Sequence, residues 1–110
     1  MPRAWEILRE FGSLLIKYAE KEHSVAFYAN KINITPYYLS SVTRDTLKET
    51  PKSLIDKQII SIMKPKLSTT GDSLKVIAEN LNFDDVSYMC RFFRRHTGMS
   101  MLEYRKRYKT

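Results

Sequence analysis

The sequence has 110 residues, enough for one domain or for two very small subdomains that share a core. Hydrophobic residues make up 43% of it and charged residues 28%, values that are ordinary for a globular protein and exclude wholesale disorder. The single cysteine excludes an internal disulfide. No apolar run approaches the ~18 residues of a membrane span, and MPRAWEILRE lacks the apolar core of a signal peptide. We therefore expect a cytoplasmic protein.

Positive charge accumulates toward the C-terminal end of the sequence. The net charge is +7, of which residues 1–55 contribute +2 and residues 56–110 contribute +5. From Arg91 onward there are seven basic residues and one acidic residue, Glu103. Such an asymmetric basic surface indicates a polyanionic partner, with DNA favoured over RNA or an anionic membrane.

The first predicted element is an amphipathic helix from about Ala4 to Glu22. Pro2 suits a helix start, and apolar residues then recur at helical spacing. The expected apolar stripe consists of Trp5, Leu8, Phe11 or Gly12, Leu15, and Tyr18 or Ala19. A stripe of this width must pack on later parts of the chain.

Residues 24–44 resemble residues 73–94 at a nearly fixed offset, which indicates an internal duplication. At an offset of 49 positions, five residues of the earlier stretch match five of the later one in order. The earlier residues are Ser24, Ala29, Ile32, Asn33 and Ile34, and the later ones are Ser73, Ala78, Leu81, Asn82 and Phe83. At an offset of 50, a second set of five residues matches Asp85, Tyr88, Met89, Phe92 and Arg94 in that order. The matching residues are Thr35, Tyr38, Leu39, Val42 and Arg44. Thr35-Pro36 should open a helix, because threonine caps it and proline at the first helical position loses no hydrogen bond.

A linking helix should join the two similar stretches. Thr50-Pro51 is a second cap-plus-proline pair, and the apolar residues that follow lie on one broad side. Pro65 breaks the backbone hydrogen-bond ladder, so we expect this helix to end or bend near Lys64. Residues 68–72 should form a loop.

The later stretch predicts a short helix, a tight turn and a second helix. Ser73 caps the first helix, Asn82 suits the turn, and Phe83 can fill the angle between the helices. Asp84 or Asp85 caps the second helix, which Gly98 terminates. This arrangement is a helix-turn-helix, in which the second helix enters the DNA major groove.

Two segments carry a family resemblance. IAENLNFDDVSYMCRFFRRHTGMSMLEYR and SVAFYANKINITPYYLS resemble the second and first units of the DNA-binding domain of AraC/XylS-type bacterial transcription regulators. The resemblance covers roughly Ser24 to Tyr108. It implies an all-α fold of about seven helices, with two helix-turn-helix subdomains joined by a linker helix. The expected segments are residues 1–50 (N-terminal helix and first subdomain), 51–67 (linker helix) and 68–110 (second subdomain).

The sequence departs from the family pattern at five positions. Asn82 and Lys48 stand where glycine is usual, and Met101 stands where proline is usual. Thr43 replaces a core phenylalanine, and Pro65 replaces a basic linker residue. These departures concern packing and helix ends more than the fold.

The resemblance and the helix faces together predict the DNA contacts. Arg91 is the strongest candidate, because a guanidinium can bond both acceptors of a guanine, and Val86 could contact a thymine methyl. The expected base-contacting residues are Tyr37, Ser40, Ser41, Val86, Ser87, Cys90 and Arg91. The expected phosphate-contacting residues are Thr35, Arg44, Lys75, Arg94 and Arg95, which set affinity and register.

We expect sequence-specific binding to double-stranded DNA, at two major-groove segments about one helical turn, ~34 Å, apart. The family resemblance implies transcription regulation through RNA polymerase, more often activation, and a possible further effector-sensing domain. The alternative is a helical protein-interaction module without DNA readout. An enzyme is disfavoured because no catalytic constellation is visible. We expect no cofactor, and one cysteine with His23 and His96 does not make a metal site.

Overall fold

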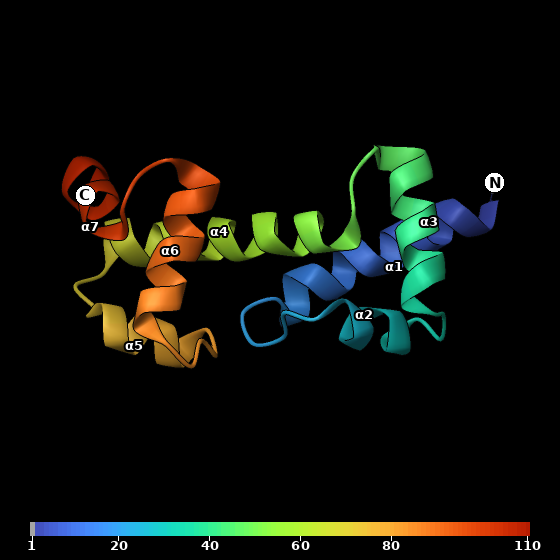
Figure 1. Ribbon diagram of the computed structural model, residues 1–110, viewed down its shortest axis with the longest axis horizontal. Coiled ribbons are helices and arrows are strands. Elements are labelled where there is room, and N and C mark those ends of the chain that lie inside the picture. Colours follow the sequence, from blue (N-terminus) through green and yellow to red (C-terminus); the bar gives the residue numbers. More distant parts are fainter. Residues whose placement is uncertain (1) are drawn as a thin grey trace. The chain divides into compact units, whose positions relative to one another are not determined.

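The computed structural model describes residues 2–110, and over these residues it contains seven helices and no strand (Figure 1). The helices are α1 (Pro2–Tyr18), α2 (Val25–Lys31), α3 (Pro36–Leu47), α4 (Pro51–Thr69), α5 (Leu74–Asn80), α6 (Val86–Thr97) and α7 (Met101–Tyr108). The predicted all-α class is thus confirmed. The chain divides into a first unit that ends at Gln58 and a second unit, Ile59–Thr110, and the division falls within α4.

The helix starts repeat between the two units as the sequence predicts. Ser24 caps α2 by accepting a hydrogen bond from the Phe27 amide, and Ser73 caps α5 in the same way from the Val76 amide, each at 3.2 Å. These caps satisfy amide groups that would otherwise have no partner in the first helical turn. The duplication is therefore one of local structure as well as of sequence.

The turns and helix ends also repeat. Asn33 and Asn82 take left-handed backbone conformations at φ 62° and 58°, one in each helix-turn-helix turn. After the second helices, Lys48 and Gly98 take the same kind of conformation at φ 60° and 76°. Lysine has a Cβ and adopts this region at a cost that glycine avoids. α3 therefore ends where the family's usual glycine would end it.

In the first unit, one side of α1 packs against the helix-turn-helix. Ile7 and Phe11 are buried together with Tyr28 of α2 and Leu39 of α3. The rings of Phe11 and Tyr28 meet edge to face with centroids 5.5 Å apart. The Tyr28 hydroxyl donates a 2.7 Å hydrogen bond to the Glu22 carbonyl, and burial raises the pKa of Tyr28 to about 12. This bond ties α2 to the turn that follows α1.

Two expectations for α1 are wrong. The helix ends at Tyr18 rather than Glu22, because the amides of Lys21 and Glu22 both bond back to the Tyr18 carbonyl in a turn. Trp5 is 55% exposed, whereas Ile7 is fully buried. α1 carries more apolar residues than one stripe needs, so periodicity alone could not decide which set faces the core.

In the second unit, aromatic side chains hold α5, α6 and α7 together. Phe83 lies in the turn with its ring centroid 5.6 Å from Phe92 and 6.0 Å from Tyr88, as expected for a residue that fills the angle between the helices. Phe93 is fully buried, and Tyr104 of α7 meets it edge to face at 5.6 Å. Phe93 is thus a core residue, and Tyr104 belongs to its packing.

Of the two outcomes expected near Lys64, an end or a bend of the helix, the end is wrong, because α4 runs through Pro65 to Thr69. Proline removes one hydrogen bond to the carbonyl four residues earlier, here that of Ser61. Pro65 and Ser61 are both exposed, so water can take the place of the lost donor. The cost of the proline is therefore reduced at this position.

The C-terminal end of α4 is capped by α7. The Arg105 guanidinium donates a 3.0 Å hydrogen bond from Nε to the Leu67 carbonyl and a 3.4 Å bond to the Lys66 carbonyl. The Thr110 amide donates to the Ser68 carbonyl at 3.0 Å. Carbonyls in the last turn of a helix have no partner within the helix, and a cation there also complements the helix dipole.

Replacing Arg105 by alanine should lower the free energy of unfolding by about 1.5–3 kcal/mol, because charged hydrogen bonds to partly buried carbonyls are lost. Urea denaturation followed by circular dichroism measures the change. Arg107→Ala on the same helix is the matched control, since Arg107 is exposed, and it should stay within about 0.5 kcal/mol of the wild type. Equal effects of the two variants would contradict the capping role.

His23 should make the protein less stable at mildly acidic pH. Burial, with a further contribution from the Lys52 charge, lowers the pKa of His23 from 6.5. The Glu20 backbone hydrogen bond and the Asp56 carboxylate act on the His23 pKa in the opposite direction. The Lys52 ammonium lies 2.8 Å from the buried Asp56 carboxylate.

The folded protein thus binds the His23 proton more weakly than the unfolded chain does. Unfolding free energy should therefore fall as pH drops below about 6.5, and His23→Gln should show a smaller decrease between pH 7.5 and pH 5. Urea titrations at several pH values measure this slope. Identical slopes for the two proteins would contradict the assignment.

Candidate nucleic-acid interface

The packing of α6 determines which of its side chains face solvent. Met89, Phe92 and Phe93 are all at most 1% exposed and form its inward side. At 100° per residue, the opposite side carries polar and charged residues. These residues are Ser87, Cys90, Arg91, Arg94 and Arg95, which we call the α6 outer face. The sequence-based assignment of this face agrees with the burial pattern.

The three arginines of the α6 outer face are all exposed but differ in their surroundings. Arg95 lies over the Phe92 ring at 5.9 Å from its centroid, and Arg94 lies 3.9 Å from the Glu103 carboxylate. Both groups of the Arg94–Glu103 pair are exposed, so the pair contributes little stability. Among residues 2–110, the Arg91 guanidinium has no hydrogen-bond or ion-pair partner. It is therefore available to an external acceptor.

Val86, which flanks this face, and Cys90, which belongs to it, are half-buried. Burial raises the pKa of the Cys90 thiol, and the nearby Arg91 charge opposes this only partly. The thiol is therefore protonated near neutral pH, whereas the thiolate is the reactive form. Cys90 fits a small contact side chain better than a redox centre.

The outer face of α3 is built in the same way but carries less charge. Leu39, Val42 and Thr43 are buried, and the Thr43 hydroxyl donates to the Ser40 carbonyl at 3.3 Å. Threonine thus fits the core position where Phe93 stands in the second unit. The opposite side, which we call the α3 outer face, consists of Tyr37, Ser40, Ser41, Arg44 and Asp45.

Tyr37 is the most prominent side chain of the α3 outer face, at 85% exposed. Ser40 and Ser41 are half-buried, and Arg44 is exposed. Asp45 stands at the repeat position of Arg95, so an acid on α3 replaces a base on α6. Sequence reasoning did not use Asp45, although the 50-residue offset was enough to find it.

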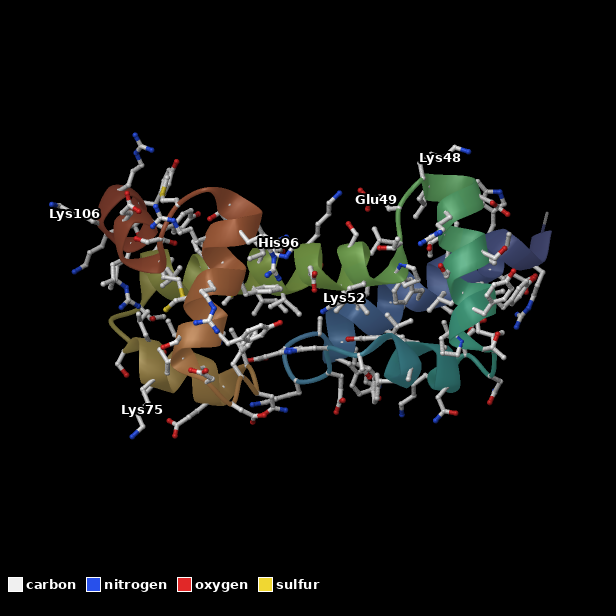
Figure 2. The ribbon with its side chains drawn as sticks, viewed as in Figure 1. Lys48, Glu49, Lys52, Lys75, His96 and Lys106 are labelled. Carbon is white, nitrogen blue, oxygen red and sulfur yellow. The ribbon has the colours of Figure 1, made fainter. Side chains whose placement is uncertain are left out.

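Thr35 and Lys75 were also expected to contact phosphate. The Thr35 side chain accepts the Tyr38 amide at 3.0 Å and caps α3, which leaves its hydroxyl proton for an outside acceptor. Lys75 lies in the first turn of α5, and its side chain extends away from the protein (Figure 2). Both positions are compatible with the expectation, and their phosphate contacts stay predictions.

Glu103 of α7 was noted in the sequence only for its charge, and its contacts at the start of α7 were not predicted. The Ser100 amide donates to the Glu103 carboxylate at 2.9 Å, and the Glu103 amide donates to the Ser100 hydroxyl at 3.0 Å, which makes a capping box. Hydrogen bonds from the Ser100 backbone and side chain lower the pKa of the Glu103 carboxyl. The Ser-x-x-Glu spacing is a known helix-start signal and could have indicated this. Glu103 is therefore held as a carboxylate near Arg94.

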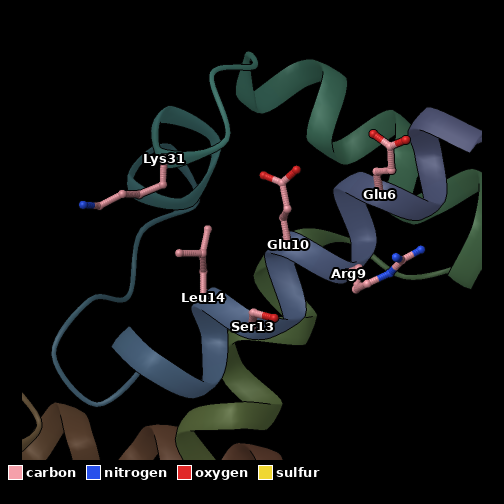
Figure 3. Close-up of a pocket in the computed structure, with 6 residues that line it drawn as sticks. All are labelled: Glu6, Arg9, Glu10, Ser13, Leu14 and Lys31. Carbon is pink, nitrogen blue, oxygen red and sulfur yellow. The ribbon is translucent and has the colours of Figure 1, made fainter.

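An open hollow of about 400 Å³ lies beside α1 (Figure 3). Its lining consists of Glu6, Arg9, Glu10, Ser13 and Leu14 of α1 and Lys31 of α2. The Lys31 side chain points away from the α1 residues that line the hollow, and its amine lies over the Tyr18 and Phe27 rings. Ligand pockets are mostly apolar and enclosed, whereas this hollow is open and rimmed by charges.

Two further features bear on other classes of function. Within residues 2–110, no three of the His, Cys, Asp and Glu side chains lie together in a way that could hold a metal ion. Over the same residues, no helix combines the length and hydropathy needed to span a bilayer.

Comparison with known protein families matches residues 28–107 to the helix-turn-helix domain of AraC type. The chain belongs to this family. AraC-type helix-turn-helix domains are DNA-binding domains of transcription regulators, which are not a class of enzymes. The match includes α3 and α6 with both outer faces.

Curated relatives agree with this membership. The chain is 27% identical over 94% of its length to the uncharacterized HTH-type transcriptional regulator YisR of Bacillus subtilis. It is 33% identical over 79% of its length to the arabinose operon regulatory protein of Escherichia coli. The chain spans 34% and 30% of the lengths of these two proteins, so it corresponds to about a third of each.

Solved structures show the same fold. The C-terminal domain of AraT, a response regulator from Geobacillus stearothermophilus, has a TM-score of 0.86 at 23% identity, covering 94% of this chain and 87% of that one. The C-terminal domain of the two-component response regulator yesN from Fusobacterium nucleatum has a TM-score of 0.79 at 19% identity, covering 86% and 93%. The predicted AraC-type architecture is confirmed.

Proposed function

We propose that this AraC-type domain binds double-stranded DNA sequence-specifically, with α3 and α6 each entering one major-groove segment, and thereby regulates transcription. The observation that carries the proposal is the α6 outer face. Buried Phe92 and Phe93 fix its orientation, and it presents three exposed arginines without an acidic residue among them. A rigid cationic helix face of this kind suits the major groove.

The α6 outer face combines base readout with phosphate binding in this proposal. Arg91, whose guanidinium has no hydrogen-bond or ion-pair partner among the described residues, reads a guanine, while Val86, Ser87 and Cys90 contact neighbouring base edges. Arg94 and Arg95 bind phosphates, as does Lys75 from α5. Arg94 must leave Glu103 to do so, at small cost because that pair is exposed.

The α3 outer face reads a second DNA segment and carries less positive charge than the α6 outer face. Tyr37, Ser40 and Ser41 supply hydroxyl groups for base edges, and Thr35 and Arg44 hold the phosphate backbone. Asp45 opposes the phosphates on this side. The first helix-turn-helix, within residues 1–50, therefore contributes shape and hydrogen bonding, while the second, within residues 68–110, contributes most of the charge.

Regulation then follows from occupancy of a promoter, without covalent chemistry or a cofactor. Bound beside a promoter, the domain contacts RNA polymerase and acts as an activator. We place the protein in the cytoplasm of a bacterium, where both partners are found. Because the regulators named above are about three times as long as this chain, an effector-sensing domain is a natural companion to it.

The central experiment is selection of bound duplexes from a random DNA pool, followed by salt titration on the selected sequence. We expect two short conserved elements in the selected pool. If about 6 phosphates are neutralised, log K should fall against log salt with a slope near −5. A flat salt dependence or a pool without conserved elements would refute the proposal.

Arg91→Ala and Arg94→Ala should have different effects on the selected duplex. Arg91→Ala should cost ~1–3 kcal/mol and relax selectivity at one base pair, because a bidentate guanine contact is lost. Arg94→Ala should weaken specific and random DNA alike and lower the salt slope by about one. Fluorescence anisotropy on both duplexes measures the two patterns. Equal losses on specific and random DNA for Arg91→Ala would remove its base-reading role.

A further inference from the structure

The two similar stretches, residues 24–50 and 73–100, have few identical side chains. With Asp84 as the inserted residue, five pairs are identical: Ser24/Ser73, Ala29/Ala78, Asn33/Asn82, Tyr38/Tyr88 and Arg44/Arg94. The fold explains the first three pairs, since the serines cap α2 and α5, the alanines are buried, and the asparagines take the left-handed turn conformation. The tyrosines and the arginines are exposed on α3 and α6. Burial and backbone geometry therefore do not account for these two pairs.

Tyr38 and Tyr88 are the third residues of α3 and α6. They are 39% and 43% exposed, and among residues 2–110 neither phenol hydroxyl has a hydrogen-bond partner. The Tyr88 ring lies beside the turn, with its centroid 6.0 Å from that of Phe83. A phenylalanine would make the same ring contact, so packing gives the hydroxyl no role.

The position of the two tyrosines on their helices indicates what the hydroxyls can reach. At 100° per residue, each lies about 90° from the middle of the outer face of its helix. An α-helix with its side chains is about 10–12 Å across, and the major groove is about 12 Å wide. A helix in the groove therefore turns the middle of its outer face to the base edges and its flanks to the sugar-phosphate walls. Tyrosine hydroxyls are among the groups that bind phosphate oxygens.

We propose that Tyr38 and Tyr88 each donate the phenol hydroxyl to a phosphate oxygen at the wall of the groove that their helix occupies. This inference rests on the proposed DNA binding and adds two contact residues to it. With Arg44 and Arg94 in the later turns of the same helices, the tyrosines form a matched pair of phosphate contacts in each unit. Both units then dock on the DNA backbone in the same way.

The positions proposed to read bases show the opposite pattern, because none of them is identical between the units. The α3 residues are Tyr37, Ser40 and Ser41, and their α6 counterparts are Ser87, Cys90 and Arg91. Phosphates are the same in every duplex, whereas two different DNA segments need different base contacts. Arg95 is an additional phosphate contact of the second unit alone, since Asp45 stands at its place in α3.

Replacing either tyrosine by phenylalanine tests the hydroxyl alone, because the ring and its packing stay. Fluorescence anisotropy measures binding of the full chain to the selected duplex and to random duplex DNA. We expect Tyr38→Phe and Tyr88→Phe each to weaken binding about threefold to tenfold on both duplexes, which corresponds to the loss of one hydrogen bond. The salt slope should stay unchanged, in contrast to Arg94→Ala, since the hydroxyl carries no charge and releases no counterion.

Tyr108→Phe is the matched control. Tyr108 is 46% exposed on α7, and its ring also lies against another aromatic ring, that of Tyr104, at a centroid distance of 4.5 Å. This variant should bind both duplexes like the wild type, and thermal melts should show wild-type stability for all three variants. The double variant of Tyr38 and Tyr88 should show the product of the two single losses, because the residues belong to different units and share no partner.

Wild-type affinity for either Tyr38→Phe or Tyr88→Phe would overturn the proposal, as would an equal loss for Tyr108→Phe. A loss confined to the selected duplex would assign the hydroxyls to base reading and overturn it as well. Absence of DNA binding by the wild-type chain would refute the proposed function and this inference with it. Wild-type binding with unaffected phenylalanine variants would refute this inference alone, so the two failures are distinguishable.

Discussion

The burial of Met89, Phe92 and Phe93 is the constraint on which the candidate interface depends. These three side chains leave α6 a single rotational setting about its own axis, since any other would expose two phenylalanine rings to water. The arginines then face outward as a consequence. Leu39, Val42 and Thr43 do the same for α3 with smaller side chains. Burial of the inner face of each helix therefore determines which face is exposed to solvent.

The two units share the same backbone features but carry different side chains on their outer faces. Their caps, left-handed turns and helix ends coincide position by position, from Ser24 and Ser73 to Lys48 and Gly98. The outer faces differ at exposed positions, where packing does not constrain the side chain. In the proposed function, this difference lets one chain distinguish two DNA segments, because shared backbone geometry does not oblige the exposed side chains to match.

Much of the fold could be predicted because its signals are local. Ser73, Asn82 and Gly98 each perform the task that their residue type suggests, and Asp85 rather than Asp84 is the cap of α6. The errors arose where the outcome depends on surroundings. Trp5 could have been core on periodicity alone, and Pro65 stays within a helix because its neighbourhood is exposed.

For the candidate interface too, local features could be predicted from the sequence, and contacts between distant residues could not. The sequence was sufficient to predict which residues of α3 and α6 face outward, since heptad-like spacing assigns helix faces. It did not indicate the contact between Arg94 and Glu103 or the Arg105 cap on α4, because both join residues whose proximity depends on packing. The DNA contacts themselves stay predictions, since they belong to a complex rather than to the chain.

The repeat also bears on how such a chain can grow. Thr50 caps α4 and Ser100 caps α7, one period of 50 residues apart, so the start of α7 corresponds to the start of α4. α4 thus ends one unit and begins the next, while α7, with 8 residues against 19, stops after the first of these roles. Lengthening α7 and adding another helix-turn-helix behind it would extend the series, which makes this architecture a candidate for tandem arrays with three reading helices.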